Sequence, residues 1–201
     1  MADQPRTYRM QRRAEAQRQT RQRITESAVE LHGTVGPSRT SISAVAARAG
    51  VRRSTVYRHF PDEAALFDAC SAHWAAANPL PDIEAWAMIG SPDERLNVAL
   101  GELYRFYERT EPMLENLLRD ETTVPLVGER FAAVRSYLAA TCETLMAGRE
   151  LKGAASRRTR AAVGHASAFS TWKSLVREQR LTAADAVRLM RALVAAAAAA
   201  Q

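Results

Sequence analysis

Apolar residues near the start of the chain recur at the spacing of an amphipathic α-helix. Ile24, Ala28 and Leu31 stand at positions i, i+4 and i+7, so they share one face of a helix. Gly33 and Pro37 follow closely, and residues of these two types commonly end helices. The pattern therefore predicts one supporting helix before the chain turns.

Two short helices separated by a glycine come next. We expect a hydroxyl near the start of the first of them to cap the free N–H groups of its opening turn. Gly50 can adopt the left-handed conformation that a sharp turn requires. The second helix covers about residues 52–59, Pro61 ends it, and Asp62 is placed to cap the helix that follows. The inward faces consist of Ile42, Val45, Ala46 and Ala49 on the first helix and of Val56 and Phe60 on the second. This succession predicts a helix-turn-helix DNA-binding motif.

The rest of the chain shows helical spacing only, which predicts an all-α protein of about nine helices. Helices are expected over residues 62–77, 91–109, 110–118, 127–147, 154–179 and from residue 182 onward. Ser91 precedes Pro92 with a glutamate three residues on, and Thr182 precedes Asp185, so both serve as helix starts.

Positive charge is concentrated at one end of the chain. Residues 1–60 carry 12 arginines and four acidic residues, whereas the whole chain of 201 residues has a net charge of +6. This asymmetry favours a polyanionic partner for the N-terminal part. Residues 1–17 lack apolar periodicity and are expected to form a basic flexible arm with Arg6, Arg9, Arg12 and Arg13. Such an arm either enters a DNA minor groove or remains a solvated tail.

Composition excludes several classes of protein. A hydrophobic fraction of 47% with 25% charged residues is typical of a globular chain with a core. The two cysteines are too few for a disulfide framework, and no apolar run is long enough for a membrane span or a secretory signal. We therefore expect a soluble, cytoplasmic protein. No phosphate-binding glycine loop, zinc-protease motif or nucleophile elbow occurs in the sequence, so an enzyme is not expected.

Residues 40–66 resemble the DNA-binding domain of TetR-family transcriptional regulators. The residues that carry the resemblance are Ile42, Val45, Ala46, Ala49, Gly50, Val51, the run from Thr55 to Pro61, Ala65 and Leu66. The resemblance implies a homodimer whose last two helices pair in a four-helix bundle, with an effector pocket among the middle helices. It divides the chain into the arm at 1–17, a DNA-binding domain at 18–66 and an effector-binding and dimerisation domain at 67–201. Arg52 and Glu63 depart from the family pattern, which often has serine and lysine there.

The residues expected to bind DNA lie on and before the second short helix. Arginine can pair with both acceptors of a guanine and threonine can contact a base edge, so Arg53 and Thr55 are candidates for base reading, with phosphate contact or solvent exposure as the alternative. Tyr57 and His59 are assigned to phosphate, with packing against the first helix as the alternative. The full set is Thr40, Arg52, Arg53, Ser54, Thr55, Tyr57, Arg58 and His59.

Large apolar and aromatic residues of the middle and late helices are candidates for an effector pocket, because such pockets are mainly apolar. The alternative for each is ordinary core or dimer interface. The set is Trp86, Tyr104, Tyr107, Met113, Phe131, Tyr137, Phe169 and Trp172. Cys70, His73, Cys142 and His165 are too scattered to predict a metal site, and no cofactor is expected.

The last two helices are expected to form a symmetric dimer interface. Ala162, Ala166, Phe169 and Trp172 would face Leu189, Met190 and Leu193. The sequence thus favours a ligand-responsive repressor that binds a palindromic operator as a homodimer and is released by a small-molecule effector. The alternative is a DNA-binding regulator or activator without such an effector.

Overall fold

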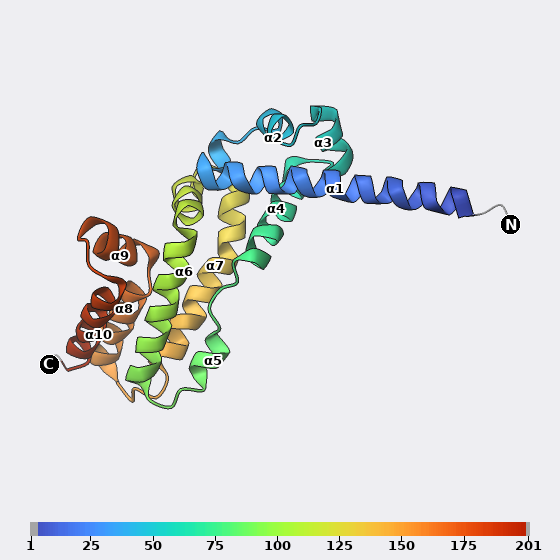
Figure 1. Cartoon of the computed structure of the whole chain (residues 1–201). Helices are drawn as coiled ribbons and strands as arrows, with labels where there is room; N and C mark the ends of the chain where they lie inside the picture. Colours follow the sequence, from blue (N-terminus) through green and yellow to red (C-terminus); the bar gives the residue numbers. More distant parts are fainter. Residues whose placement is uncertain (1–3, 200–201) are drawn as a thin grey trace. The chain divides into compact units, whose positions relative to one another are not determined.

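The structure, a computed structural model, describes residues 4–199, with side chains described from residue 8 onward. Within this range the chain forms ten α-helices and no strand, which confirms the all-α expectation (Figure 1). The helices are α1 (Gln4–Thr34), α2 (Ile42–Arg48), α3 (Arg53–His59), α4 (Glu63–Ala77), α5 (Ile83–Ala87), α6 (Pro92–Asp120), α7 (Pro125–Met146), α8 (Gly153–Ala166), α9 (Phe169–Lys173) and α10 (Ala183–Ala199). A 3₁₀ turn, η1 (Pro37–Arg39), and a π-helical turn, η2 (Ser174–Glu178), complete the order.

The chain divides into two compact units. The first consists of Met1–Pro79 and Pro112–Glu129, and the second of Leu80–Glu111 and Arg130–Gln201. The first unit thus contains α1 to α4 together with the end of α6 and the start of α7. The second contains α5, the rest of α6 and α7, and α8 to α10.

The three N-terminal helices and α4 share one hydrophobic core. Its fully buried members include Ile24, Ala28 and Val56, and the buried set is completed by Ile42, Val45, Ala46, Ala49, Phe60, Leu66 and Cys70. Ser41 Oγ accepts from the Ala44 N–H at 3.1 Å, and Asp62 Oδ1 accepts from the Ala65 N–H at 2.7 Å, so α2 and α4 begin at side-chain caps. Gly50 has a φ of +65°, as the turn between α2 and α3 requires. The expected helix-turn-helix is therefore present.

α1 extends much further toward the N-terminus than expected. Its helix begins at Gln4, whereas the sequence predicted a flexible arm over residues 1–17, of which 1–3 lie outside the described residues. Arginine, glutamine, alanine and glutamate all favour helices, so the segment is helical by propensity without an apolar face. Glu15 accepts hydrogen bonds from Arg18 and from Gln19, the latter at 3.2 Å, which adds local support.

α6 continues through a proline that was expected to start a new helix. Pro112 lies inside α6, which runs unbroken from Pro92 to Asp120. Proline removes one backbone hydrogen bond from the ladder, and the surrounding helix tolerates this loss. Thr110 Oγ1 donates to the Phe106 carbonyl at 2.6 Å one turn earlier.

The single helix predicted over residues 154–179 is divided into α8, α9 and η2. Ser167 ends α8, and its hydroxyl donates to the Val163 carbonyl at 2.9 Å. The carbonyls exposed by this break are bound from α6: Tyr104 Oη donates to Ala166 O at 2.9 Å and Tyr107 Oη donates to Ser167 O at 2.6 Å. These partners are about sixty residues away in the sequence, so local periodicity could not reveal the break.

Neither a transmembrane helix nor a metal-binding cluster is found in the described part of the chain. None of its helices combines the length and the hydrophobicity needed to cross a membrane. Cys70 and Cys142 are both free thiols, and no group of three or more His, Cys, Asp and Glu side chains converges among residues 8–199.

Candidate DNA-binding surface and effector site

α3 presents a polar side to solvent and an apolar side to the core of the first unit. Val56 is fully buried, whereas Arg53 and Tyr57 are exposed. Arg52 stands at the N-cap of α3 and makes no capping bond with its side chain, as its departure from the family pattern implied. The remaining outward side chains are those of Ser54, Thr55 and Arg58, with Thr55 partly buried.

Arg53 and Tyr57 are joined on this exposed side. The Arg53 guanidinium donates to Tyr57 Oη at 3.1 Å and lies 5.5 Å from the centre of the tyrosine ring. The hydrogen bond to Tyr57 raises the pKa of Arg53, so the guanidinium is charged at every accessible pH. Arg53, a candidate for base reading, and Tyr57, a candidate for phosphate binding, therefore form a hydrogen-bonded pair in the protein alone.

His59 is placed differently from the other members of the set. Its Nε2 atom is buried and has no hydrogen-bond partner among the residues that the structure describes. Burial lowers the pKa of His59, and the neighbouring Arg58 and Arg21 lower it further, so the ring is neutral at physiological pH. Arg21 Nη1 donates to the His59 carbonyl, and its guanidinium lies 4.0 Å from the centre of the Phe60 ring. Arg21 of α1 thus binds the backbone of His59, and the assignment of the His59 side chain to phosphate stays a prediction.

Thr40 lies in the connection that leads into α2. Its hydroxyl donates to the Gly36 carbonyl at 2.8 Å, and its N–H donates to Pro37 O at 3.1 Å. Thr40 therefore closes the η1 turn and precedes the capping Ser41.

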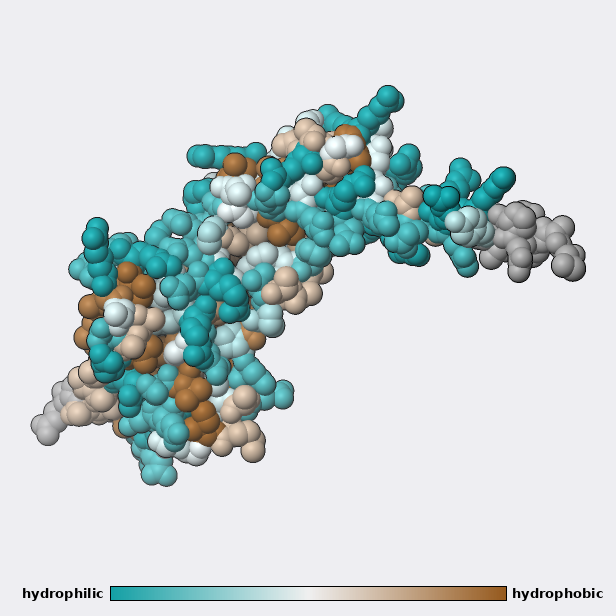
Figure 2. All heavy atoms as spheres, viewed as in Figure 1, coloured by the Kyte–Doolittle hydropathy of each residue, from teal (hydrophilic) through white to brown (hydrophobic). Residues whose placement is uncertain are grey.

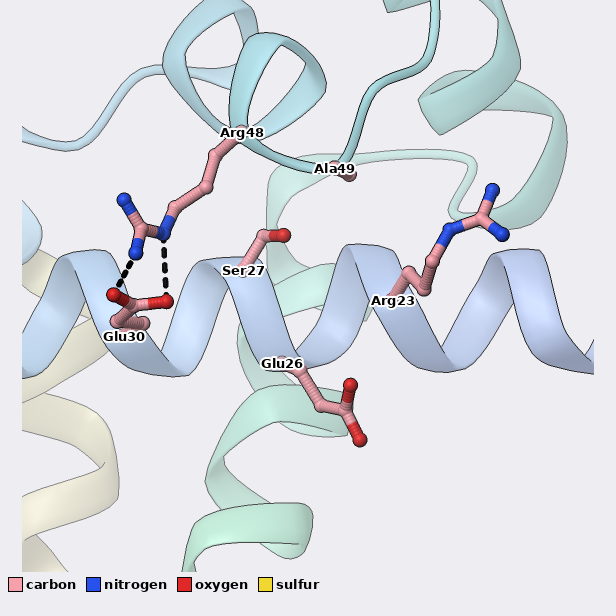
Figure 3. A pocket seen from close by; sticks show the side chains of 6 residues that line it. All are labelled: Arg23, Glu26, Ser27, Glu30, Arg48 and Ala49. Carbon is pink, nitrogen blue, oxygen red and sulfur yellow. Dashed lines mark hydrogen bonds and ion pairs between the residues drawn. The ribbon is translucent and has the colours of Figure 1, made fainter.

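An open groove of about 500 Å³ lies between α1 and the end of α2 (Figure 3). Its lining residues are Arg23, Glu26, Ser27, Glu30, Arg48 and Ala49. Arg48 Nε donates to Glu30 at 2.7 Å, so these two charges neutralise each other. Figure 3 shows the Glu26 side chain directed away from Arg48, while Arg23 extends on the α2 side of α1. Arg23 is an exposed cation beside the helix-turn-helix that sequence reasoning did not single out.

The end of α6 holds the connection between α1 and α2. Asn116 Nδ2 donates to the His32 and Gly33 carbonyls, both at 3.0 Å, which satisfies backbone groups at the end of α1. Arg119 donates to Val35 O at 3.1 Å, and the Asp120 carboxylate accepts from the Ser38 N–H at 2.9 Å. These polar side chains lie more than eighty residues from their partners, and no sequence motif identified them.

In the second unit, four of the expected effector-pocket residues form an aromatic cluster. Tyr107 lies at the centre, with its ring centroid 5.5 Å from that of Phe169, 6.1 Å from Trp172 and 6.4 Å from Tyr104. Burial raises the pKa values of both tyrosines, so they are neutral phenols. Trp172 is fully buried, and its Nε1 donor has no hydrogen-bond partner in the described structure.

The other four expected pocket residues have contacts of their own. Tyr137 on α7 donates to Pro81 O at 2.9 Å, and burial raises its pKa to about 12. Trp86 on α5 donates to Glu102 at 2.7 Å, and Phe131 is buried on α7. Met113 belongs to the first unit, where its methyl group lies near Gly33.

The helices expected to mediate dimerisation pack against each other within one chain. Ala162, Ala166 and Met190 are buried there, and Trp172 belongs to the aromatic cluster. The exposed large apolar residues of α10 are instead Leu189 and Leu193, with exposed fractions of 46% and 40%. The faces that the sequence assigned to a partner are therefore mostly used inside the monomer.

This arrangement is a helix-turn-helix in the first unit, followed by a second, helical unit. Residues 24–70 match the model of the tetR family of bacterial regulatory proteins. The match covers the helix-turn-helix part of the chain and supports the resemblance found in the sequence.

Named relatives are transcriptional regulators. Over 107 aligned residues the chain is 33% identical to the HTH-type transcriptional repressor KstR of Mycolicibacterium smegmatis. The aligned residues make up 53% of this chain and 52% of KstR. The chain thus matches about half the length of this curated relative.

Two solved structures share the fold. A TetR-like transcriptional regulator from Rhodococcus sp. RHA1 superposes with a TM-score of 0.64 and 21% identity, covering 90% of this chain and 97% of the other. FadR from Bacillus subtilis, solved in complex with stearoyl-CoA, gives a TM-score of 0.55 and 16% identity over 90% and 98% of the two chains. At these identities the likeness concerns the fold alone.

Proposed function

We propose that the protein is a transcriptional repressor that binds a palindromic operator as a homodimer and is released by a small-molecule effector. The observation that carries the proposal is the exposed polar side of α3, which is anchored to the core by the buried Val56. A helix of this kind can enter the major groove, where arginine distinguishes bases.

A two-fold dimer would place two copies of the exposed side of α3 in a symmetric arrangement. Leu189 and Leu193 are four residues apart on α10, and the exposed Ala192 and Ala196 lie on the same face. Small residues beside leucines permit two helices to approach closely, and one such face is self-complementary in a two-fold dimer. Two α3 helices related by a two-fold axis require an operator with inverted half-sites.

The aromatic cluster supports an effector site in the second unit. A buried indole N–H without an acceptor is costly, and a ligand that offers an acceptor to Trp172 Nε1 would offset that cost. Tyr104 and Tyr107 are already bound to backbone carbonyls, so Trp172 is the polar group of this cluster that a ligand can satisfy. Acyl-CoA thioesters combine an apolar chain with a carbonyl acceptor, and FadR, a protein of the same fold, was solved with stearoyl-CoA.

Selection of binding sites from random-sequence duplexes tests the DNA-binding part of this proposal. We expect enrichment of an inverted repeat, and footprinting should show two half-sites. Enrichment of no sequence would refute it.

A thermal-shift series with acyl-CoA thioesters of increasing chain length tests the effector part. A ligand that binds only the folded protein raises its unfolding temperature and should release the operator. Trp172→Phe, which keeps the ring but removes the donor, should weaken this response more than Trp74→Phe in α4. No shift with any chain length, or equal effects of the two variants, would argue against this effector site.

A further inference from the structure

α3 is too short to hold its own orientation. It comprises seven residues, whereas isolated helices shorter than about 12 residues are marginal in water. The residue at its N-cap, Arg52, makes no capping bond with its side chain. The direction in which the outward side chains of α3 point therefore depends on the contacts that hold this helix to the rest of the first unit.

Two of these contacts are apolar. Val56, in the middle of α3, is fully buried, and Phe60, at its C-cap, is 1% exposed. The Phe60 N–H donates to the Val56 carbonyl at 2.9 Å, which is the hydrogen bond that closes the helix. The hydrophobic effect is non-directional, so burial alone defines the tilt and rotation of α3 less sharply than a hydrogen bond does.

Arg21 of α1 supplies a third contact, which is polar. Its Nη1 donates to the His59 carbonyl, and its guanidinium lies 4.0 Å from the centre of the Phe60 ring. The last carbonyls of a helix have no partner within the helix, and the helix dipole favours a cation there. A guanidinium is planar and can stack on a ring while it donates in its own plane, so one side chain holds two consecutive residues.

The sequence of α1 places Arg21 on the side of the helix that faces the core. Arg21 precedes Ile24 by three residues and Ala28 by seven, and both of these are fully buried. At about 100° per residue, the three positions share one face. Figure 1 shows α1 passing beside the end of α3, and Figure 2 shows mostly hydrophilic residues along the N-terminal half of α1. Arg21 is thus the point at which the apolar face of α1 gives way to a charge, beside the end of α3.

We propose that Arg21 is a positioning residue for DNA reading, which fixes the tilt and rotation of α3 and makes no DNA contact of its own. Arg53 and His59 are about 9 Å apart along the axis of α3. A tilt of about 10° at the anchored end moves Arg53 by roughly 1.5 Å, whereas recognition geometry has to be held within about 0.5 Å. Loss of the anchor therefore misaligns Arg53 with a base edge. The inference rests on the proposed repressor function, since it requires α3 to lie on DNA.

Arg21→Lys in the full-length protein separates positioning from a contact with phosphate. Lysine keeps the charge and binds phosphate as a point charge, but it lacks the planar fork that stacks and donates together. The substitution would therefore spare a phosphate contact and lose the contacts with α3. Arg23→Lys is the matched control, because Arg23 is an exposed arginine of the same helix, about 160° away from Arg21 around its axis.

Hydrogen exchange in the free protein tests the anchor itself. The Phe60 amide closes the last hydrogen bond of α3, so loosening of this end should raise its exchange rate. In Arg21→Lys we expect exchange faster by about tenfold or more, the factor implied by loss of a hydrogen bond from a charged donor. The Ala49 amide, which donates to Val45 O at 2.9 Å in the neighbouring helix, is the internal reference and should be unchanged. Arg23→Lys should leave both rates at the wild-type values.

Relative affinity for operators with single base-pair substitutions tests the consequence for reading. A bidentate arginine contact gives a preference of roughly 5- to 150-fold for the correct base pair. In Arg21→Lys this preference should fall to near unity at the base pair that Arg53→Ala also affects, whereas Arg23→Lys should keep the wild-type preference. Partial unfolding lowers the affinity for every sequence by the same factor, so loss of stability alone leaves the ratio of affinities unchanged.

Three results would overturn the proposal. Wild-type base preference in Arg21→Lys would mean that Arg21 only stabilises the fold. Loss of preference with a wild-type exchange rate would mean that Arg21 contacts the DNA itself. An equal loss of preference in Arg23→Lys would show that the effect is not specific to Arg21. Failure of the repressor function differs from all three, because the wild-type protein would then enrich no sequence from the random duplexes.

Discussion

The carboxylate of Asp120, at the end of α6, accepts a hydrogen bond from the backbone N–H of Ser38 at 2.9 Å. Its side chain is only 3% exposed, and Arg119 donates to both of its oxygens. Burial alone would raise the pKa of Asp120, but the hydrogen bonds from Arg119 and Ser38 outweigh burial and lower it. A charge in α6 therefore fixes the turn that leads into the helix-turn-helix.

Asp120→Asn should destabilise the protein by about 1–3 kcal/mol, because the amide cannot replace a charged acceptor for both partners. Urea unfolding monitored by circular dichroism measures this loss. Glu84→Gln, which neutralises an exposed carboxylate on α5, should change the free energy of unfolding by less than about 0.5 kcal/mol. Equal effects of the two substitutions would contradict a special role for Asp120.

Gly36→Ala should be more destabilising than Gly50→Ala. Both glycines have positive φ, +93° and +65°, so alanine is strained at each, and Gly36 with a ψ of 159° lies in a region that is almost exclusive to glycine. A Cβ atom at Gly36 would also collide with the Arg119 guanidinium and lie 2.7 Å from Asp120 Oδ2, whereas at Gly50 it would meet no atom within 4 Å. Thermal or urea unfolding measures the difference between the two variants, to which the backbone strain at Gly36 and the close approach of α6 both contribute. Equal losses of stability would show that the clash is relieved without cost.

His32 should make the protein less stable as the pH falls. Burial lowers the pKa of His32 to about 4, although Asp120 raises it slightly, so the folded state holds the ring neutral between Phe67 and Cys70. Because the folded pKa is below the unfolded value of about 6.5, the unfolded state binds more protons and stability declines from pH 6.5 to 4. A shift of this size corresponds to about 3 kcal/mol when complete.

Urea titrations at several pH values test the assignment to His32. His32→Gln should remove most of the pH dependence in this window. His59→Gln should remove a smaller part, because the pKa of that partly exposed residue is also lowered. His73→Gln, at an exposed position of α4, should leave the dependence unchanged. A pH dependence that persists in full after His32→Gln would refute the assignment.

The sequence predicted the helix-turn-helix because its determinants are local. Ser41, Gly50 and Asp62 act within a few residues of where they stand, so their types and spacing were sufficient. The extent of α1 was missed because helix propensity without an apolar face leaves no periodic pattern to detect. The break after Ala166 and the contacts of Asp120 depend on partners far along the chain, which local patterns do not contain.

Local sequence patterns were also insufficient to identify the dimer-forming side of α10. Periodicity identified the apolar residues, but it could not decide which side packs on α8 and which remains exposed. Leu189→Glu combined with Leu193→Glu should convert the proposed dimer to a monomer at micromolar concentration, since both charges would be buried without partners. Sedimentation velocity measures the change. Leu118→Glu, at a comparably exposed leucine of α6, is the matched control and should remain dimeric. An unaffected dimer in the α10 variant would place the interface elsewhere.

The Arg53–Tyr57 pair should determine both the preference for one base pair and the affinity for DNA. Arg53→Ala should lose discrimination at one base position by about 1–3 kcal/mol if the guanidinium binds a guanine at two points. Tyr57→Phe removes the hydroxyl to which Arg53 donates, so it should weaken binding to all sequences and also relax preference at the same base pair. The double variant should lose less binding free energy than the sum of the two single losses, because each single change already breaks the shared hydrogen bond.

Binding to a panel of operators with every single base-pair substitution measures all three effects, with Arg105→Ala on the exposed side of α6 as the control. Additive losses, or an Arg53→Ala protein with unchanged preference at every position, would exclude this pair from base reading.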